Sequence, residues 1–260
     1  MIPDASLIES ALTGLAAVAM LAIIVWSISV AKHDVGIVDV VWPIFICLPA
    51  VVVVLLEPPG PRAVAVLALA LAWAARLSGH IALRSLGEPE DRRYQAIRRR
   101  NEPGFVIKSL YLVFLLQAAL GWIVATPLMT AVAGHAPWSF IDTVGIALMA
   151  FGIAFEAIAD WQLRAFKRDP SSEGQVMDKG LWRYSRHPNY FGEFCIWWGA
   201  WLLATATGAW WTIVSPLLMS VLLLRVSGVA LLEEDIGKRR PGYDDYVRRT
   251  NAFFPGRPGP

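Results

Sequence analysis

Long apolar runs are the feature of this sequence that most restricts its fold. Seven stretches approach or exceed the ~20 residues that an α-helix needs to cross a bilayer. They lie at residues 6–30, 37–57, 62–83, 109–133, 139–163, 190–207 and 209–226. Hydrophobic residues make up 56% of the 260 residues, more than a soluble core of this length requires. Because backbone polar groups in lipid must be satisfied within the segment, the sequence predicts an all-α integral membrane bundle of seven transmembrane helices.

The basic residues predict the orientation of this bundle. If the N-terminus lies outside, 21 of the 23 Lys and Arg residues fall on the cytoplasmic face; Arg76 lies within a span and Arg62 on the outer side. This asymmetry follows the positive-inside rule. The long polar segments 84–108, 164–189 and 233–260 share the cytoplasmic face. We therefore expect a cytoplasmic C-terminus, a bacterial inner-membrane location and an active site that opens to the cytoplasm.

Several other classes of protein are not indicated. The first apolar run follows Asp4 and Glu9 instead of a basic region, so it is interpreted as a retained span. Both cysteines, Cys47 and Cys195, lie within apolar runs, which predicts no disulfide and no metal site. The net charge of +2 is too small to indicate nucleic-acid binding. No internal repeat, Rossmann glycine motif or Walker loop is present, and residues 1–260 are expected to form one membrane domain.

The stretch from Gly180 to Glu193 is the most informative polar segment. Pro188 suits the first turn of a helix, which then runs into the sixth apolar stretch. Asn189 and Glu193, four residues apart, share one face of that helix. An amide and a carboxylate entering lipid indicate a functional site. The simpler alternative is a helix cap with an interfacial glutamate.

Three other spans carry polar residues at helical spacing. They are Asp39 and Trp42 in the second span, Trp73, Arg76 and His80 in the third, and Glu156, Asp160, Arg164 and Lys167 in the fifth. The tail adds Glu233, Glu234, Tyr243, Tyr246, Arg249 and Thr250. A structural ion pair between Asp39 and Arg76 and ordinary i,i+4 pairing in the fifth span are the alternatives to a functional role.

On these residues the chain resembles the steroid 5α-reductase superfamily, in its bacterial branch. The resemblance rests on Gly180-Leu181-Trp182-x-Tyr184-x-x-x-Pro188-Asn189-Tyr190-x-Gly192-Glu193, on Asp160-x-x-Leu163-Arg164, and on Glu233-Glu234 followed by Pro241-Gly242-Tyr243-x-x-Tyr246. It covers most of residues 150–255. Over residues 1–110 it rests on the spans and a few polar positions.

The resemblance implies an oxidoreductase that holds NADPH on its cytosolic side and reduces the C4–C5 double bond of 3-oxo-Δ4 steroids. Residues 1–133 would form the substrate half and residues 139–260 the cofactor half. The implied cofactor residues are Asp160, Arg164, Lys167, Trp182, Tyr184, Arg186, His187, Asn189, Glu193, Glu234, Tyr243, Tyr246 and Arg249. The chain departs from the eukaryotic pattern in the fifth span, where Glu156 replaces an amide, and in the second and third, where Asp39, Trp42 and Trp73 stand at the catalytic positions.

Reduction of an enone requires a donor that polarises the ketone oxygen. Asp39 is the first candidate if it is protonated among apolar neighbours, and Trp42, Trp73 and Arg76 are the alternatives. The expected partners are a steroid or another hydrophobic enone and membrane lipids, with no nucleic acid and no obligatory protein partner.

Two other functions stay open. Arg186-His187-Pro188-x-Tyr190-x-Gly192 and Glu233-Glu234 also resemble isoprenylcysteine and phospholipid methyltransferases, which are membrane enzymes that use S-adenosylmethionine. A small-molecule transporter is the non-enzymatic alternative, although the repeats typical of transporters are not seen.

Overall fold

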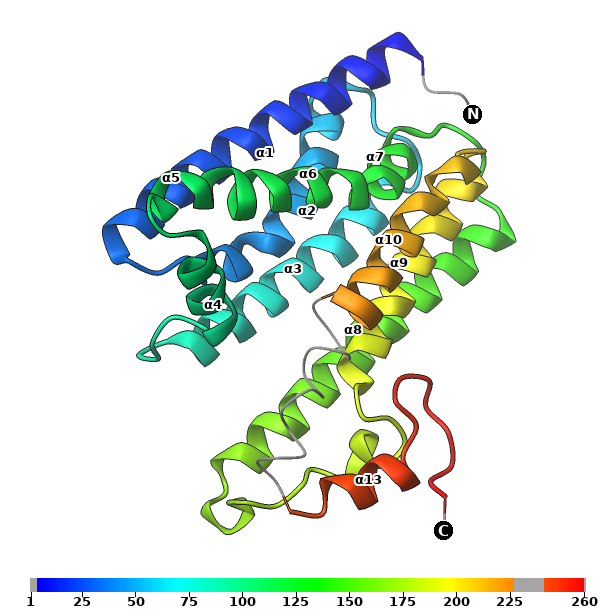
Figure 1. Cartoon of the computed structure of the whole chain (residues 1–260). Helices are drawn as coiled ribbons and strands as arrows, with labels where there is room; N and C mark the ends of the chain where they lie inside the picture. The colour runs from blue at the N-terminus through cyan, green and yellow to red at the C-terminus, as the bar shows by residue number, and fades with distance from the viewer. Residues whose placement is uncertain (1–3, 227–240, 260) are drawn as a thin grey trace. The chain divides into compact units, whose positions relative to one another are not determined.

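The computed structural model describes residues 4–226 and 241–259, which are helical or irregular, without a strand (Figure 1). The helices are α1 (Ala5–Lys32), α2 (Ile37–Leu56), α3 (Ala63–Ser85), α4 (Arg92–Asn101), α5 (Phe105–Ser109), η1 (Leu110–Leu115), α6 (Leu116–Val124), α7 (Thr126–Ala133), α8 (Phe140–Arg168), η2 (Pro170–Ser172), η3 (Gly180–Arg183), α9 (Pro188–Ala206), η4 (Trp210–Ile213), α10 (Val214–Val221), η5 (Leu222–Val226) and α13 (Tyr243–Arg249). Two compact units result. The first holds residues 1–142 and 203–215, and the second residues 143–202 and 216–260.

Five helical segments in the described part of the chain are long and apolar enough to cross a membrane. They are α1, α2, α3, the continuous segment Phe105–Val124, and α8. α1, α2, α3 and α8 begin within one residue of the corresponding predicted spans, although α8 extends to Arg168, and the fourth segment ends at Val124 instead of residue 133. The described residues are thus helical, as predicted, and five of their segments are candidate membrane spans. The count of seven spans and the sides of the termini stay predictions.

The last four predicted spans differ in detail from the observed helices. The fourth ends at Val124, because Pro127 stands in the first turn of a separate helix, α7, and has no backbone N–H for the preceding helix. The sixth begins at Pro188, as predicted, but Asn189 and Glu193 lower the hydropathy of its first turns. The seventh, over Trp210–Arg225, is a shorter apolar helix.

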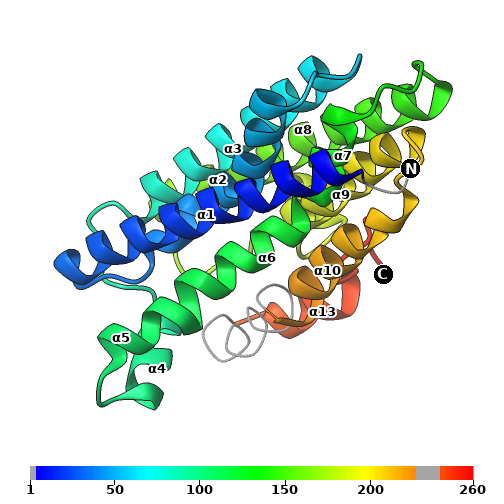
Figure 2. The ribbon, with the colours of Figure 1, turned by 90° about the horizontal axis from the view of Figure 1, so that it is seen from above.

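In the first unit α2 contacts α1, α3, α6 and α7, and α1 also contacts α6 (Figure 2). Glycine residues allow the backbones of these helices to lie close together. A Cβ on Gly14 of α1 would lie 3.1 Å from Pro49 of α2, and one on Gly121 of α6 would lie 3.0 Å from the Phe45 Cβ. A core of Val, Ala and aromatic side chains that includes Tyr94 fills the space near the ends of α1 and α4.

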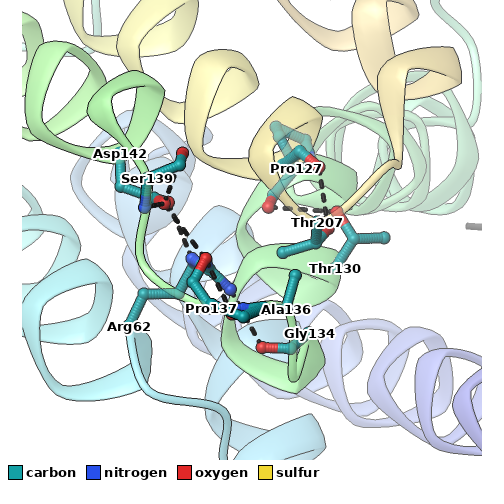
Figure 3. A network of polar contacts seen from close by, with 10 residues as sticks. Arg62, Pro127, Thr130, Gly134, Ala136, Pro137, Ser139, Asp142 and Thr207 are labelled. Atoms are coloured by element: carbon teal, nitrogen blue, oxygen red, sulfur yellow. Dashed lines mark hydrogen bonds and ion pairs between the residues drawn. The ribbon is translucent and has the colours of Figure 1, made fainter.

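A fully buried ion pair joins the beginning of α3 to the beginning of α8 (Figure 3). Arg62 Nε lies 2.7 Å from Asp142 Oδ1, and Nη2 lies 3.1 Å from Oδ2. The guanidinium also donates to the carbonyl oxygens of Gly134, Ala136 and Pro137. Ser139 donates to Asp142 through its amide and its hydroxyl. This network explains why the one arginine predicted on the outer side is tolerated: its charge is neutralised and its donors are used.

In the second unit glycines bring α8 and α9 into close contact. A Cβ on Gly192 would lie 2.7 Å from the Gly152 carbonyl oxygen, and a Cβ on Gly199 would lie 2.8 Å from the Gly145 oxygen. The same approach places the backbone of Glu156 against Gly192. The packing of the two helices therefore sets the buried carboxylates of α8 beside the first turns of α9.

The buried ion pair can be tested by removing one charge. Asp142→Asn leaves the Arg62 guanidinium buried without its anion, so it should lower the free energy of unfolding by about 3–5 kcal/mol. The double variant Arg62→Met with Asp142→Leu should be less destabilised than Asp142→Asn. Thermal unfolding of the detergent-solubilised protein measures both effects. The control is Asp245→Asn, whose exposed pair with Arg248 should contribute at most about 1 kcal/mol. An Asp142→Asn protein as stable as the wild type would contradict this account.

Candidate functional site

In the first unit, Asp39 lies at the centre of a polar cluster. It occupies the first turn of α2, where an acidic side chain is favoured by the helix dipole. The Tyr94 hydroxyl donates to its Oδ1 over 2.5 Å, and Arg93 Nη2 lies 2.8 Å from its Oδ2. Both partners belong to α4, within the polar segment that follows α3. The helix α4, which lies outside the apolar runs, thus covers the carboxylate of Asp39.

Gln117 of α6 completes the cluster. Its Nε2 donates to the Tyr94 hydroxyl oxygen over 3.2 Å. The phenol is therefore held between a donor from α6 and an acceptor from α2. Gln117 stands one residue after the first residue of α6, directly beyond the π-helical turn η1, a feature that is frequent at functional sites. Three elements thus fix one phenolic O–H group, although Asp39 keeps about 23% of its side chain exposed.

Two acidic residues hold α4 in place. Asp91 caps the helix by accepting from the Arg93 amide over 2.9 Å. Partial burial disfavours its charge, but the hydrogen bonds and positive charge of Arg93 hold the pKa of Asp91 below its usual value. Glu90 accepts from the Val35 amide over 2.9 Å and pairs with Arg98 over 2.8 Å. The turn between α1 and α2 is thereby tied to α4, which fixes the position of Tyr94.

The other predicted catalytic residues lie on α2 and α3. Trp42 packs against the core of the first unit, Trp73 is fully buried, and Arg76 is partly buried. The alternative of an ion pair between Asp39 and Arg76 is not what the structure shows, because Asp39 pairs with Arg93. Sequence reasoning missed Arg93, Tyr94 and Gln117. A usable signal was that Tyr94 is the one aromatic residue between positions 86 and 104.

The first unit also contains an apolar pocket of about 170 Å³ between α1, α6, α7 and η4. Its lining includes Leu7, Ile8, Trp122 and Trp211. The pocket is smaller than the ~300–1,000 Å³ of typical small-molecule sites. It adjoins the first turns of α1, whereas Asp39 follows the last turn of that helix. We therefore do not assign it to the Asp39 cluster.

In the second unit the predicted polar faces of α8 and α9 meet. Asn189 Nδ2 donates to Asp160 Oδ1 over 3.2 Å, and Trp197 Nε1 donates to Glu193 Oε1 over 3.1 Å. Asp160, Glu193 and Glu156 are each at most 6% exposed. Three carboxylates buried in one helix pair are costly unless they are partnered or functional. The structure thus brings the side chains of Asp160 and Asn189 into contact, and their role in cofactor binding stays a prediction.

The segment before α9 is fixed to α8 and to the tail. Trp182 Nε1 donates to the Ala159 carbonyl oxygen over 3.0 Å, and the Tyr246 hydroxyl donates to the Trp182 carbonyl oxygen. Arg186 Nη1 donates to the Thr250 carbonyl oxygen over 2.6 Å, and the Ser185 hydroxyl to that of Phe253 over 2.8 Å. The hydrogen bonds of Trp182, Tyr246 and Arg186, which are predicted cofactor residues, thus hold this segment against α8 and the tail.

The remaining predicted cofactor residues differ in exposure. His187 is buried and stacks on Tyr190, with the ring centroids 5.7 Å apart, and Tyr243 is buried beside Tyr246. Arg164 is partly buried, whereas Lys167, Tyr184 and Arg249 are exposed. Arg249 lies 3.6 Å from Asp178. Glu234, with its neighbour Glu233, lies outside the described residues. The unit therefore offers buried acids and an amide on α8 and α9, with cations nearer its surface.

The environment of Tyr94 gives a pH-dependent test. Burial raises the pKa of Tyr94, and the Asp39 carboxylate raises it further. The phenol therefore stays protonated in the folded protein above about pH 10, where an unfolded tyrosine ionises. This contribution to stability is complete below about pH 10 and is lost as the pH rises above it. Unfolding measured against pH should show a steeper loss for the wild type than for Tyr94→Phe. The exposed-tyrosine control Tyr111→Phe should follow the wild type, and parallel wild-type and Tyr94→Phe curves would rule out this role.

Comparison with known proteins gives one match. Residues 25–250 match the family described as protein of unknown function (DUF1295). No curated protein and no solved structure matches the chain. Because the matched region includes both the Asp39 cluster and the α8–α9 site, and covers most of the sequence, the chain belongs to this DUF1295 family.

Proposed function

We propose that the protein is an NADPH-dependent membrane reductase of the C4–C5 double bond of 3-oxo-Δ4 steroids or similar hydrophobic enones. The observation that carries this proposal is the Tyr94 phenol, held between Asp39 and Gln117 at the end of an apolar helix bundle. The resemblance to steroid 5α-reductases supports the substrate class. The site would open to the cytoplasm, where the basic segments are expected.

An enone accepts hydride at its β-carbon only when its carbonyl oxygen is polarised. When bound, NADPH would supply the hydride to the β-carbon, and the enolate that forms would take a proton from solvent at its α-carbon after the hydride has been transferred. The chain has to provide a hydrogen-bond donor that stabilises negative charge on the ketone oxygen. It also has to exclude water from the reacting carbons.

Tyr94 is the donor that the geometry favours. In the absence of substrate its O–H points to Asp39 Oδ1, so it can turn to a ketone oxygen that approaches the same carboxylate. Gln117 donates to the phenol oxygen and so supports the developing charge on the ketone through the hydroxyl. Arg93 pairs with Asp39 Oδ2, so Asp39 is held in place as the acceptor that orients the phenol. This assignment replaces our initial choice of Asp39 as the donor.

The second unit suits the cofactor. NADPH presents ribose hydroxyls, an amide and phosphates, which require acids, amides and cations respectively. The acids and the amide of this unit are Asp160, Glu193 and Asn189. Its cations are Arg164, Lys167 and Arg249. Arg186 is less suited to a phosphate, because its Nη1 donates to carbonyl oxygens of the tail.

A methyltransferase is the second candidate, and one observation favours it. Glu156, Asp160 and Glu193 bury three carboxylates in one helix pair, which would suit the cationic sulfonium of S-adenosylmethionine. The tyrosine cluster of the first unit has no evident use in methyl transfer. We therefore rank the reductase first.

Cofactor binding separates the two candidates. Calorimetry on the purified protein should show NADPH binding and no comparable binding of S-adenosylmethionine. Asp160→Ala and Asn189→Ala should each weaken NADPH binding about tenfold, because each removes a group that hydrogen-bonds the ligand. Asp244→Ala, an exposed carboxylate on α13, is the matched control and should bind like the wild type. Tight S-adenosylmethionine binding without NADPH binding would establish the methyltransferase instead.

The chemistry is tested by steroid-dependent NADPH oxidation, with progesterone or testosterone as substrate and a 5α-reduced product. Tyr94→Phe removes the donor and should lower turnover about 10²–10³-fold while NADPH affinity is retained. Asp39→Asn should lower turnover by misorienting the phenol. Its stability should change by no more than about 1 kcal/mol, because the ion pair that it removes is partly exposed. Tyr111→Phe is the control. Wild-type turnover by Tyr94→Phe would remove Tyr94 from catalysis and leave Asp39, Trp42, Trp73 and Arg76 as candidates.

A further inference from the structure

The two faces of α4 have different compositions. Tyr94, Ile97 and Asn101 follow one another at helical spacing and face the first unit, where Tyr94 is 5% exposed. Arg92, Arg99 and Arg100 share the opposite face and are all exposed. We call these three arginines the outer face of α4. The orientation of α4 is fixed, because Tyr94 is hydrogen-bonded to Asp39 and Arg98 forms an ion pair with Glu90.

The outer face differs in its contacts from the other arginines of the helix. Arg93 pairs with Asp39 and Asp91, and Arg98 pairs with Glu90 and lies 4.8 Å above the Phe105 ring. Among the residues that the structure describes, Arg92, Arg99 and Arg100 form no ion pair and no hydrogen bond. Three cations thus share a face of about two turns, unneutralised by the rest of the unit.

α4 lies between two candidate membrane spans. The helix connects two membrane-spanning candidates, α3 and Phe105–Val124, through short segments on either side (Figure 1). Leu86, just after α3, is 79% exposed, and Ile107, in α5 at the beginning of the candidate span Phe105–Val124, is 69% exposed. Large apolar side chains that flank a cationic helix are typical of helices lying at the lipid interface.

We propose that the outer face of α4 binds the anionic headgroups of phospholipids. Charge complementarity selects this occupant: three unpaired cations lie beside apolar residues suited to the acyl boundary, and anionic headgroups occupy that depth. The positive-inside rule explains why the segment is basic, but it requires only a number of charges. It does not require three unpaired arginines on one face, opposite a buried tyrosine. The proposal is independent of the catalytic assignment.

The test compares lipids on the full-length protein in neutral detergent. Native mass spectrometry would measure the retention of dioleoylphosphatidylglycerol against dioleoylphosphatidylcholine. The wild type should prefer the anionic lipid, and high salt should weaken the preference. Because each basic residue at an anionic surface strengthens binding about fivefold, replacing Arg92, Arg99 and Arg100 by Gln should reduce the affinity by about two orders of magnitude. Replacing the same three residues by Lys should retain the preference.

The matched control is the triple replacement of Arg168, Arg225 and Arg257, exposed arginines elsewhere in the chain, by Gln. It should bind the anionic lipid as the wild type does. Three results would overturn the proposal: no anionic preference in the wild type, equal losses in both Gln triple variants, or displacement of the lipid by inorganic phosphate alone. Loss of NADPH binding with an unchanged lipid preference would instead assign this face to the phosphates of the cofactor.

Discussion

Polar groups placed among apolar helices have to be satisfied by other parts of the same chain, and this constraint accounts for the features that distinguish the first unit. Arg62 and Asp142 neutralise each other where neither is exposed, and the guanidinium satisfies three carbonyl oxygens besides. At the beginning of α2, Asp39 meets the same requirement with Arg93 and Tyr94. The two solutions differ in one respect. Arg62 and Asp142 are fully buried, and their charged groups are hydrogen-bonded within the protein. Asp39 instead remains partly exposed, and the hydroxyl hydrogen of its partner Tyr94 can rotate toward another acceptor.

The sequence predicts the long helices well, because their cause is local. An apolar run of about 20 residues favours a helix on its own composition. The ends of the helices are less predictable: the fourth span was expected to run through Pro127, whereas α2 continues through Pro43 and Pro49. The pairing of polar side chains that lie far apart in the sequence has no such local cause. Asp39 and Arg93 are 54 positions apart, and Arg62 and Asp142 are 80 apart. The suggestion of Arg76 as the partner of Asp39 came from the neighbouring span, whereas the partner comes from a short helix in a loop that composition alone describes as basic and polar.

The second unit was more predictable for a physical reason. Asp160 and Asn189 lie on two helices that follow one another closely, and the glycines at 152 and 192 allow those helices to touch. Once α9 begins at Pro188, the spacing of Asn189 and Glu193 fixes which face meets α8. The sequence did not reveal which of the predicted cofactor residues are used to hold the protein itself together. Trp182, Arg186 and Tyr246 were expected to contact a ligand, yet these residues form hydrogen bonds that hold the loop and the tail against the protein itself.

The helix α4 lies in the polar segment between two candidate membrane spans and contributes Tyr94 to the cluster around Asp39. Its inner face carries Tyr94, which donates to the carboxylate of Asp39. Asp91 caps the helix, and Glu90 links it to the turn between α1 and α2. Fixing one face of a helix fixes the other, since the two are joined through a rigid backbone. The position of Tyr94 and the direction of Arg92, Arg99 and Arg100 are therefore set by the same contacts. A charge contact on the outer face would therefore act on the same helix that positions the phenol.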